Sequence, residues 1–174
     1  MQRSKLTKKM AMVAMFAAMS YVITVIAHYL HLTIVPSVPF LTYDPKDIII
    51  CIAGFILGPI PVIGVSVAVS FLEMITISQT GFYGFIMNII STCAFVLPAA
   101  LIYRSKKSFK GALLSLLTGF ISVIIVMTLW NIIITPLYMG IERSLLINQF
   151  LIYIVIFNIV KTAVNVALVL LLYK

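Results

Sequence analysis

Residues 149–173, QFLIYIVIFNIVKTAVNVALVLLLY, form an almost unbroken apolar run in which Lys161 is the one charged residue. A helix needs about 20 mostly apolar residues to cross the roughly 30 Å hydrocarbon core of a bilayer, and this run is long enough. An ionisable side chain at membrane depth is costly and usually faces the interior of a helix bundle, where it marks a site. The stretch therefore predicts a membrane-spanning helix with one functional face.

The composition of the whole chain agrees with this interpretation. Of its 174 residues, 63% are hydrophobic and 9% are charged, whereas soluble domains have about 25% charged residues. We therefore expect a multi-pass protein of the cell membrane, with residues 1–174 forming a single transmembrane substrate-binding domain. The net charge of +8 does not indicate a nucleic-acid partner, because the basic residues lie between apolar runs and not on an aromatic-interleaved face.

The apolar runs predict an all-α bundle of six transmembrane helices separated by turn sequences such as GPIP (58–61) and RSKKSFKG (104–111). The expected spans are residues 8–30, 47–58, 61–79, 83–103, 111–135 and 149–173. The second span is anomalous, because about 12 residues make a helix of only about 18 Å. It is half-spanning, tilted within the bundle, or continuous with the third span through a kink at Pro59 and Pro61.

The orientation follows from the basic residues, which favour the cytoplasmic side of the membrane. Six spans place nine of them on one side, whereas only Lys46 and Arg143 fall in loops on the other side. Both termini are therefore expected in the cytoplasm. The nine residues are Arg3, Lys5, Lys8, Lys9, Arg104, Lys106, Lys107, Lys110 and Lys174.

Polar side chains inside the spans form stripes at helical spacing. Asn158, Lys161 and Asn165 share one face of the last helix, and Thr128, Asn131 and Thr135 share one face of the fifth. Asn88 and Glu73 lie in the outer halves of the fourth and third helices. These groups predict one cavity for a polar, planar or carbonyl-rich ligand, and the alternative is hydrogen bonding between helices. A Lys161–Glu73 ion pair is left open.

The first helix carries a stripe of small residues, Ala11, Ala14 and Ala18. Small residues at this spacing allow another helix to approach closely. The partner is either a helix of the same chain or another membrane subunit.

Several functional classes lack their motifs. The chain has no G-x-x-x-x-G-K-[ST] phosphate loop and no HExxH, and it has only four carboxylates. We therefore expect no enzymatic activity, no metal site and no resident cofactor. A small binding subunit without its own energy source fits better than an autonomous pump.

Five segments in order carry a family likeness: the basic start with Ala14-xxx-Ala18, YDPKDIII leading into GFILGP (54–59), MNIISTCAFVLPAALIYRSKK (87–107), WNIIITPLYMG (130–140) and FNIVKTAVN (157–165). Over nearly its whole length the chain resembles the substrate-binding S components of energy-coupling-factor (ECF) vitamin transporters, and among them the riboflavin-specific members.

This resemblance implies high-affinity riboflavin binding in the outward half of a six-helix bundle, under the loop between the first two helices. Asn88, Asn131, Asn158 and Lys161 match the motif positions, and helical spacing adds Asn165. The resemblance also implies that the segment Phe40, Leu41, Thr42 and Tyr43 closes over the ligand. The alanine face would dock on a transmembrane coupling subunit, and two cytoplasmic ATPases would drive uptake.

Two alternatives stay open. The same architecture serves another vitamin, such as thiamine or biotin, or the chain is a self-sufficient proton-coupled transporter that uses Glu73.

Overall fold

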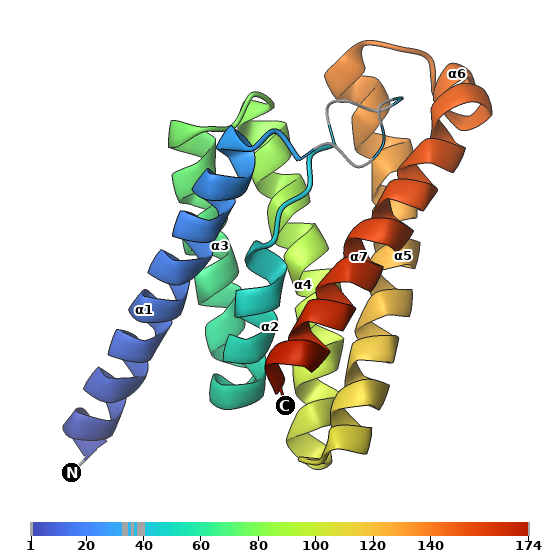
Figure 1. Ribbon diagram of the computed structural model, residues 1–174. Helices are drawn as coiled ribbons and strands as arrows, with labels where there is room; N and C mark the ends of the chain where they lie inside the picture. Colours follow the sequence, from blue (N-terminus) through green and yellow to red (C-terminus); the bar gives the residue numbers. More distant parts are fainter. Residues whose placement is uncertain (1, 33–34, 36, 38–40, 174) are drawn as a thin grey trace.

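A computed structural model of the protein describes residues 2–32, 35, 37 and 41–173, without the side chains of residues 2–5. Within this part of the chain every regular element is helical, which confirms the predicted all-α class (Figure 1). The elements are α1 (Gln2–Tyr29), α2 (Lys46–Leu57), α3 (Pro59–Thr76), α4 (Gly81–Ser105), α5 (Phe109–Met139), α6 (Arg143–Leu145), the π-helix η1 (Leu146–Phe150) and α7 (Leu151–Tyr173).

Five stretches of helix in the described chain are long and apolar enough to cross a membrane. They are Leu6–Tyr29, Pro59–Thr76, Gly81–Ser105, Phe109–Met139 and Arg143–Tyr173. The last stretch joins α6, η1 and α7, so the final helical rod begins several residues before the predicted start at 149. The predicted shortness of the second helix is confirmed, since α2 has 12 residues. Six crossings and cytoplasmic termini remain predictions.

The break between α2 and α3 lies at Gly58, as the GPIP sequence predicts. Gly58 has a φ of 87°, a value that side chains rarely tolerate, and its N–H caps α2 by donating to the Gly54 carbonyl. Pro59 then opens α3, where its fixed φ suits the first helical position and its missing N–H removes no helical hydrogen bond. The two helices are therefore separate elements and not one kinked span.

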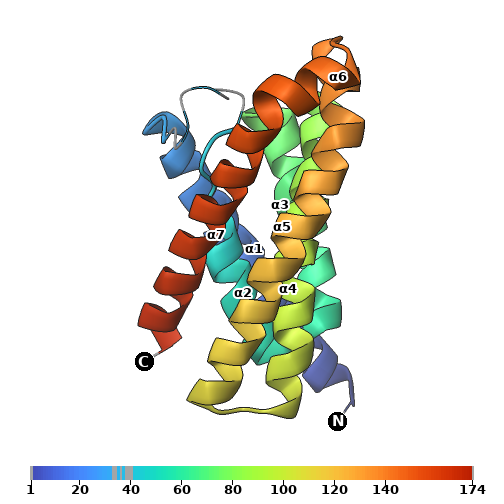
Figure 2. The same ribbon diagram turned by 90° about the vertical axis from the view of Figure 1, so that its right-hand side faces the viewer.

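Helix α2 lies at the centre of the bundle, packed against α1, α3, α4 and α7 (Figures 1 and 2). Ile50, Cys51 and Ala53 are fully buried there. Gly54 allows the closest approach, because a Cβ at this position would lie 3.1–3.2 Å from the side chains of Val96 and Ala100. This central position places the first turn of α2 inside the protein.

Helices α4 and α5 form the antiparallel hairpin visible in Figure 2. Gly119 makes their contact possible, since a Cβ there would collide with the backbone oxygen of Phe95. Helix α5 continues past the predicted end at 135 and includes Pro136, which neighbouring helices make tolerable in a membrane bundle.

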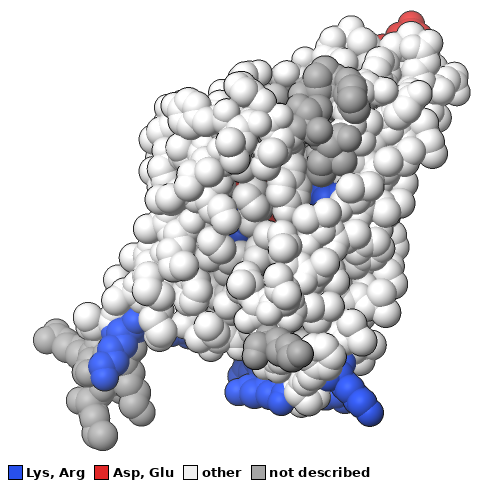
Figure 3. Space-filling view, viewed as in Figure 1, with Lys and Arg blue, Asp and Glu red and all other residues white. Residues whose placement is uncertain are grey.

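Most charged residues lie either at one end of the molecule or buried within it. Figure 3 shows Lys and Arg gathered at the lower end of the molecule, near the N-terminus and the α4–α5 connection, and both termini lie toward that end in Figure 1. Figure 3 also shows an exposed acidic area at the upper tip and small areas of both charge signs recessed within the upper body. These recessed charges belong to the candidate site.

Candidate ligand-binding site

A cavity of about 220 Å³ lies toward the end of the bundle opposite the termini. Residues of α1, α3, α4, α5 and α7 line it, together with the segment 41–44 that leads into α2. Seven of the nine predicted ligand-binding residues are among its walls. They are Leu41, Thr42, Tyr43, Asn88, Asn131, Asn158 and Lys161.

The other two predicted residues differ. Asn165 is buried on the same face of α7 as Lys161, but it is not among the cavity walls. Its Oδ1 instead accepts a hydrogen bond of 2.9 Å from the hydroxyl of Tyr43. Phe40 lies outside the described residues.

Asn131 is fixed within α5 by its own helix. Its Nδ2 donates to the carbonyl of Met127 at 2.7 Å, and its Oδ1 accepts from the hydroxyl of Thr135 at 2.9 Å. An amide has two N–H donors and two acceptor lone pairs, so these two bonds use half of its capacity. The side chain is therefore held in a fixed orientation at the cavity wall, where it is fully buried.

Asn158 and Lys161 present the polar face of α7. Asn158 Nδ2 donates to the Ile154 carbonyl at 2.8 Å, which again leaves hydrogen-bonding capacity in the amide. Lys161 Nζ lies 3.3 Å from Oδ2 of Asp47, while Oδ1 of Asp47 accepts from Thr92 at 2.6 Å. The ammonium at membrane depth is therefore compensated by a carboxylate from the first turn of α2.

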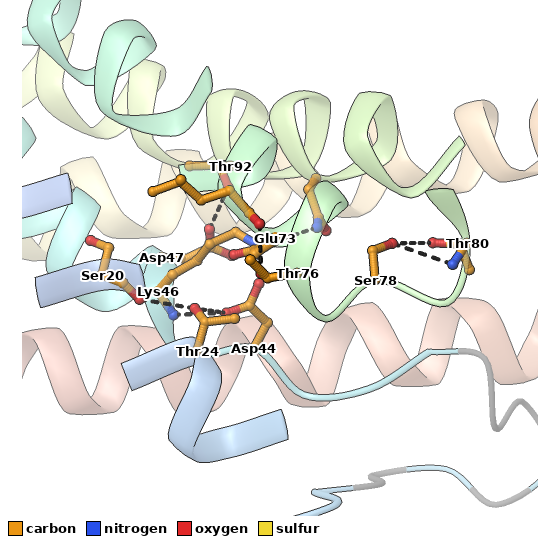
Figure 4. Close-up of polar contacts among 12 residues, drawn as sticks. Ser20, Thr24, Asp44, Lys46, Asp47, Glu73, Thr76, Ser78, Thr80 and Thr92 are labelled. Atoms are coloured by element: carbon orange, nitrogen blue, oxygen red, sulfur yellow. Dashed lines mark hydrogen bonds and ion pairs between the residues drawn. The ribbon is translucent and has the colours of Figure 1, made fainter. Parts of the chain in front are cut away.

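A second group of charges, formed by Asp44, Lys46 and Glu73, lies beside Asp47 (Figure 4). Lys46 Nζ donates to Glu73 Oε2 at 2.7 Å and also pairs with the carboxylate of Asp44. Glu73 Oε2 also accepts from Asn88 Nδ2 at 2.7 Å. The Lys161–Glu73 pair that the sequence left open does not form, because each residue has a different partner.

Lys46 corrects one sequence interpretation. The sequence predicts that it lies in an outer loop, yet only 1% of its surface is exposed and it begins α2. The available signal was the combination of charges in YDPKD with the shortness of the following helix. A helix of about 18 Å aligned with its neighbours at one end must begin inside the membrane at the other.

The segment before α2 is tied to the bundle on both sides. Thr24 of α1 donates to Asp44 Oδ1 at 2.9 Å, and Tyr43 reaches across to Asn165 of α7. Burial, followed by the negative charges of Asp47 and Asp44, raises the pKa of Tyr43 to about 12. The hydroxyl therefore remains a donor at neutral pH. Burial would raise the pKa of Asp44, but Lys46 and Lys161 hold it below its ordinary value.

Aromatic rings border the polar walls. Tyr83 and Tyr138 line the cavity with their ring centroids 6.1 Å apart, and Phe157 contributes from α7. Flat apolar faces beside amide groups suit a planar ligand with polar edges.

The small-residue stripe lies elsewhere. Ala11, Ala14 and Ala18 are exposed on α1, whereas Phe16 and Ser20 are buried against the bundle. The stripe therefore does not form the packing contact between α1 and its neighbours α2 and α3.

Comparison with known proteins gives consistent relatives. Residues 8–173 match the family model described as the substrate-specific component of ECF transporters. The chain is 30% identical over 135 residues to the riboflavin transporter FmnP of Bacillus subtilis. This alignment covers 75% of this chain and 68% of that protein. It is 29% identical over 173 residues to the riboflavin transporter RibU of Staphylococcus aureus, covering 96% and 89%. The fold is similar, with a TM-score of 0.81 and 26% identity, to a solved S component of a bacterial ECF transporter, covering 97% and 94% of the two chains.

Proposed function

The chain belongs to the substrate-specific components of ECF transporters, and from that premise we propose that it binds riboflavin at the outer side of the cell membrane for uptake. Its two similar relatives are named riboflavin transporters. The observation that carries the proposal is the cavity in which Asn88, Asn131, Asn158 and Lys161 meet.

The chemistry of these walls suits riboflavin. Isoalloxazine is planar, with an apolar dimethylbenzene ring at one end and carbonyl and N–H groups at the other. The asparagine amides of α5 and α7 match both kinds of polar group, and Lys161 donates to a carbonyl or to a ribityl hydroxyl. Tyr83, Tyr138 and Phe157 provide apolar surface for the ring.

The segment 41–43 serves as the cover of the site. It lines the cavity, and Tyr43 and Asp44 fasten it to α7 and α1. In this role Asn165 is a positioning residue that holds Tyr43 and does not touch the vitamin.

Uptake requires partners in this proposal. The exposed face of Ala11, Ala14 and Ala18 docks on the transmembrane coupling subunit, and two cytoplasmic ATPases supply the energy. The chain crosses the membrane six times with both termini in the cytoplasm, and α2 forms the short crossing. The basic end of the molecule, which the positive-inside rule assigns to the cytoplasm, supports this orientation.

The direct test is the ligand of the protein purified in mild detergent. We expect yellow, flavin-fluorescing protein, or apo-protein that quenches added riboflavin with a 1:1 endpoint. Mass spectrometry of the extracted ligand identifies the vitamin. Protein that is colourless and gives no quenching contradicts riboflavin binding, and recovered thiamine or biotin assigns the site to another vitamin.

A second test concerns the energy source. Vesicles that contain the chain alone should bind riboflavin without accumulating it, and co-reconstitution with the coupling subunit and ATPases should give ATP-dependent uptake. Accumulation by the chain alone under a proton gradient would instead identify a self-sufficient transporter.

A further inference from the structure

The buried charges at the cavity do not balance. Asp44, Asp47 and Glu73 supply three carboxylates, while Lys46 and Lys161 supply two ammonium groups. The segment 33–40, part of which is not described, contains no charged side chain. With all five groups ionised, the network therefore carries one net negative charge.

Glu73 is the member whose bonding is incomplete. Its Oε2 accepts from both Lys46 and Asn88, each at 2.7 Å. Both partners are donors, and one is cationic. Its Oε1 is buried and has no hydrogen-bond partner among the described residues. The residue is only 3% exposed and lines the cavity.

Both ammonium groups already lie beside carboxylates of the protein. Lys161 lies beside Asp47, and Lys46 is shared between Asp44 and Glu73. A phosphate monoester would add about 1.5 to 2 negative charges at neutral pH. A desolvated site of low effective dielectric increases the repulsion between like charges. A neutral polyol meets no such penalty.

We propose that Glu73 is a specificity-determining residue, which makes the cavity select the unphosphorylated vitamin over its 5′-phosphate, FMN. The inference rests on the proposed riboflavin function and adds to it a preference between riboflavin and FMN. Glu73 acts by its charge next to the cavity, and its free Oε1 is also placed to accept from a hydroxyl of a neutral ligand.

The first experiment uses the unaltered protein in detergent at pH 8, at which free histidine is neutral, because His28 and His31 also line the cavity. Fluorescence quenching gives the Kd of riboflavin, FMN and a neutral 5′-ester of riboflavin. We expect riboflavin and the ester to bind with similar Kd and FMN to bind at least about tenfold more weakly. Equal rejection of the neutral ester would assign the discrimination to size and overturn the proposal.

The second experiment uses Glu73→Gln, which keeps the shape of the side chain. This change leaves two carboxylates and two ammonium groups. The net charge of the network is then zero, and no charged group is left unpaired. We expect the preference for riboflavin over FMN to narrow by about tenfold or more. An unchanged Kd ratio in a variant that still binds riboflavin would overturn the proposal.

Glu142→Gln is the matched control, because Glu142 is an exposed acid at the start of α6 and outside the cavity walls. Its ratio of the two Kd values should equal that of the unaltered protein. If the unaltered protein binds neither flavin, the proposed function fails. If it binds both flavins equally, only the present inference fails.

Discussion

The hydroxyl of Tyr43 donates a hydrogen bond of 2.9 Å to Oδ1 of Asn165, joining the segment before α2 to the last helix of the bundle. Asn165 shares a helix face with Asn158 and Lys161, yet it is not among the cavity walls and its carbonyl oxygen accepts this bond. One stripe of α7 therefore has two roles, since its upper part faces the ligand space and its lower part holds the covering segment.

Tyr43→Phe should raise the dissociation rate of riboflavin by about fivefold, because one neutral hydrogen bond contributes about 1 kcal/mol. Stopped-flow recovery of flavin fluorescence measures this rate. Asn165→Ala should have a similar effect, and the double variant should be little worse than either single one.

Tyr103→Phe is the matched control for this prediction, since the Tyr103 hydroxyl contacts Tyr173 at the far end of the bundle. It should leave the dissociation rate unchanged. Additive effects of Tyr43→Phe and Asn165→Ala would show that the two residues act independently.

Lys161→Met should weaken riboflavin binding and also destabilise the fold. Removing one member of a buried ion pair costs about 3–5 kcal/mol, because the other charge is left unpaired, and here that charge is Asp47. Thermal unfolding in detergent should show a lower Tm.

The paired variant Lys161→Met with Asp47→Asn separates the two effects. It should recover most of the lost Tm, because no carboxylate is then unpaired, but it should not recover riboflavin affinity. Recovery of both would assign Lys161 a structural role only.

Ala14→Trp combined with Ala18→Trp should spare riboflavin binding and abolish ATP-driven uptake, because large side chains prevent close helix approach. Uptake into vesicles with the complete transporter, measured beside Kd, tests this. Ile121→Trp with Ile125→Trp is the control, as these exposed α5 residues have the same spacing. Normal uptake by the alanine variant would exclude this docking face.

Gly119→Ala should destabilise the bundle by about 1–3 kcal/mol, since overpacking forces backbone shifts of this cost. The added Cβ would meet the backbone oxygen of Phe95. Gly64→Ala is the control, because nothing lies within 4 Å of a Cβ there. The two Tm values should move in opposite directions, as alanine favours a helix more than glycine does. Equal Tm values would show that the α4–α5 contact is not tight.

Local patterns were sufficient for the helices and for the shared face of Asn158 and Lys161. Runs of apolar residues located the helices, and GPIP located the break at Gly58. Spacing of 3 and 4 placed Asn158 and Lys161 on one buried face. These features depend on residues close in sequence, which is why the sequence reveals them.

The pairing of the charged residues could not be predicted from such local patterns. Lys46 and Glu73 are 27 residues apart, and Thr92 and Asp47 are 45 apart. Their pairing depends on how α2, α3 and α4 pack against one another, and a helical period contains no information about that packing. Asn165 shows the same limit, because spacing identifies its face but not which segment covers it.

The sequence by itself determined an all-helical membrane protein, a second helix too short for an ordinary crossing, and a polar face around Lys161. These follow from hydrophobicity, helix geometry and turn chemistry, which act along the chain. Only the tertiary structure decided that Lys161 pairs with Asp47, that Lys46 is buried with Glu73, and that Tyr43 donates to Asn165. Those partners come from different helices, and the packing of a short central helix brings them together.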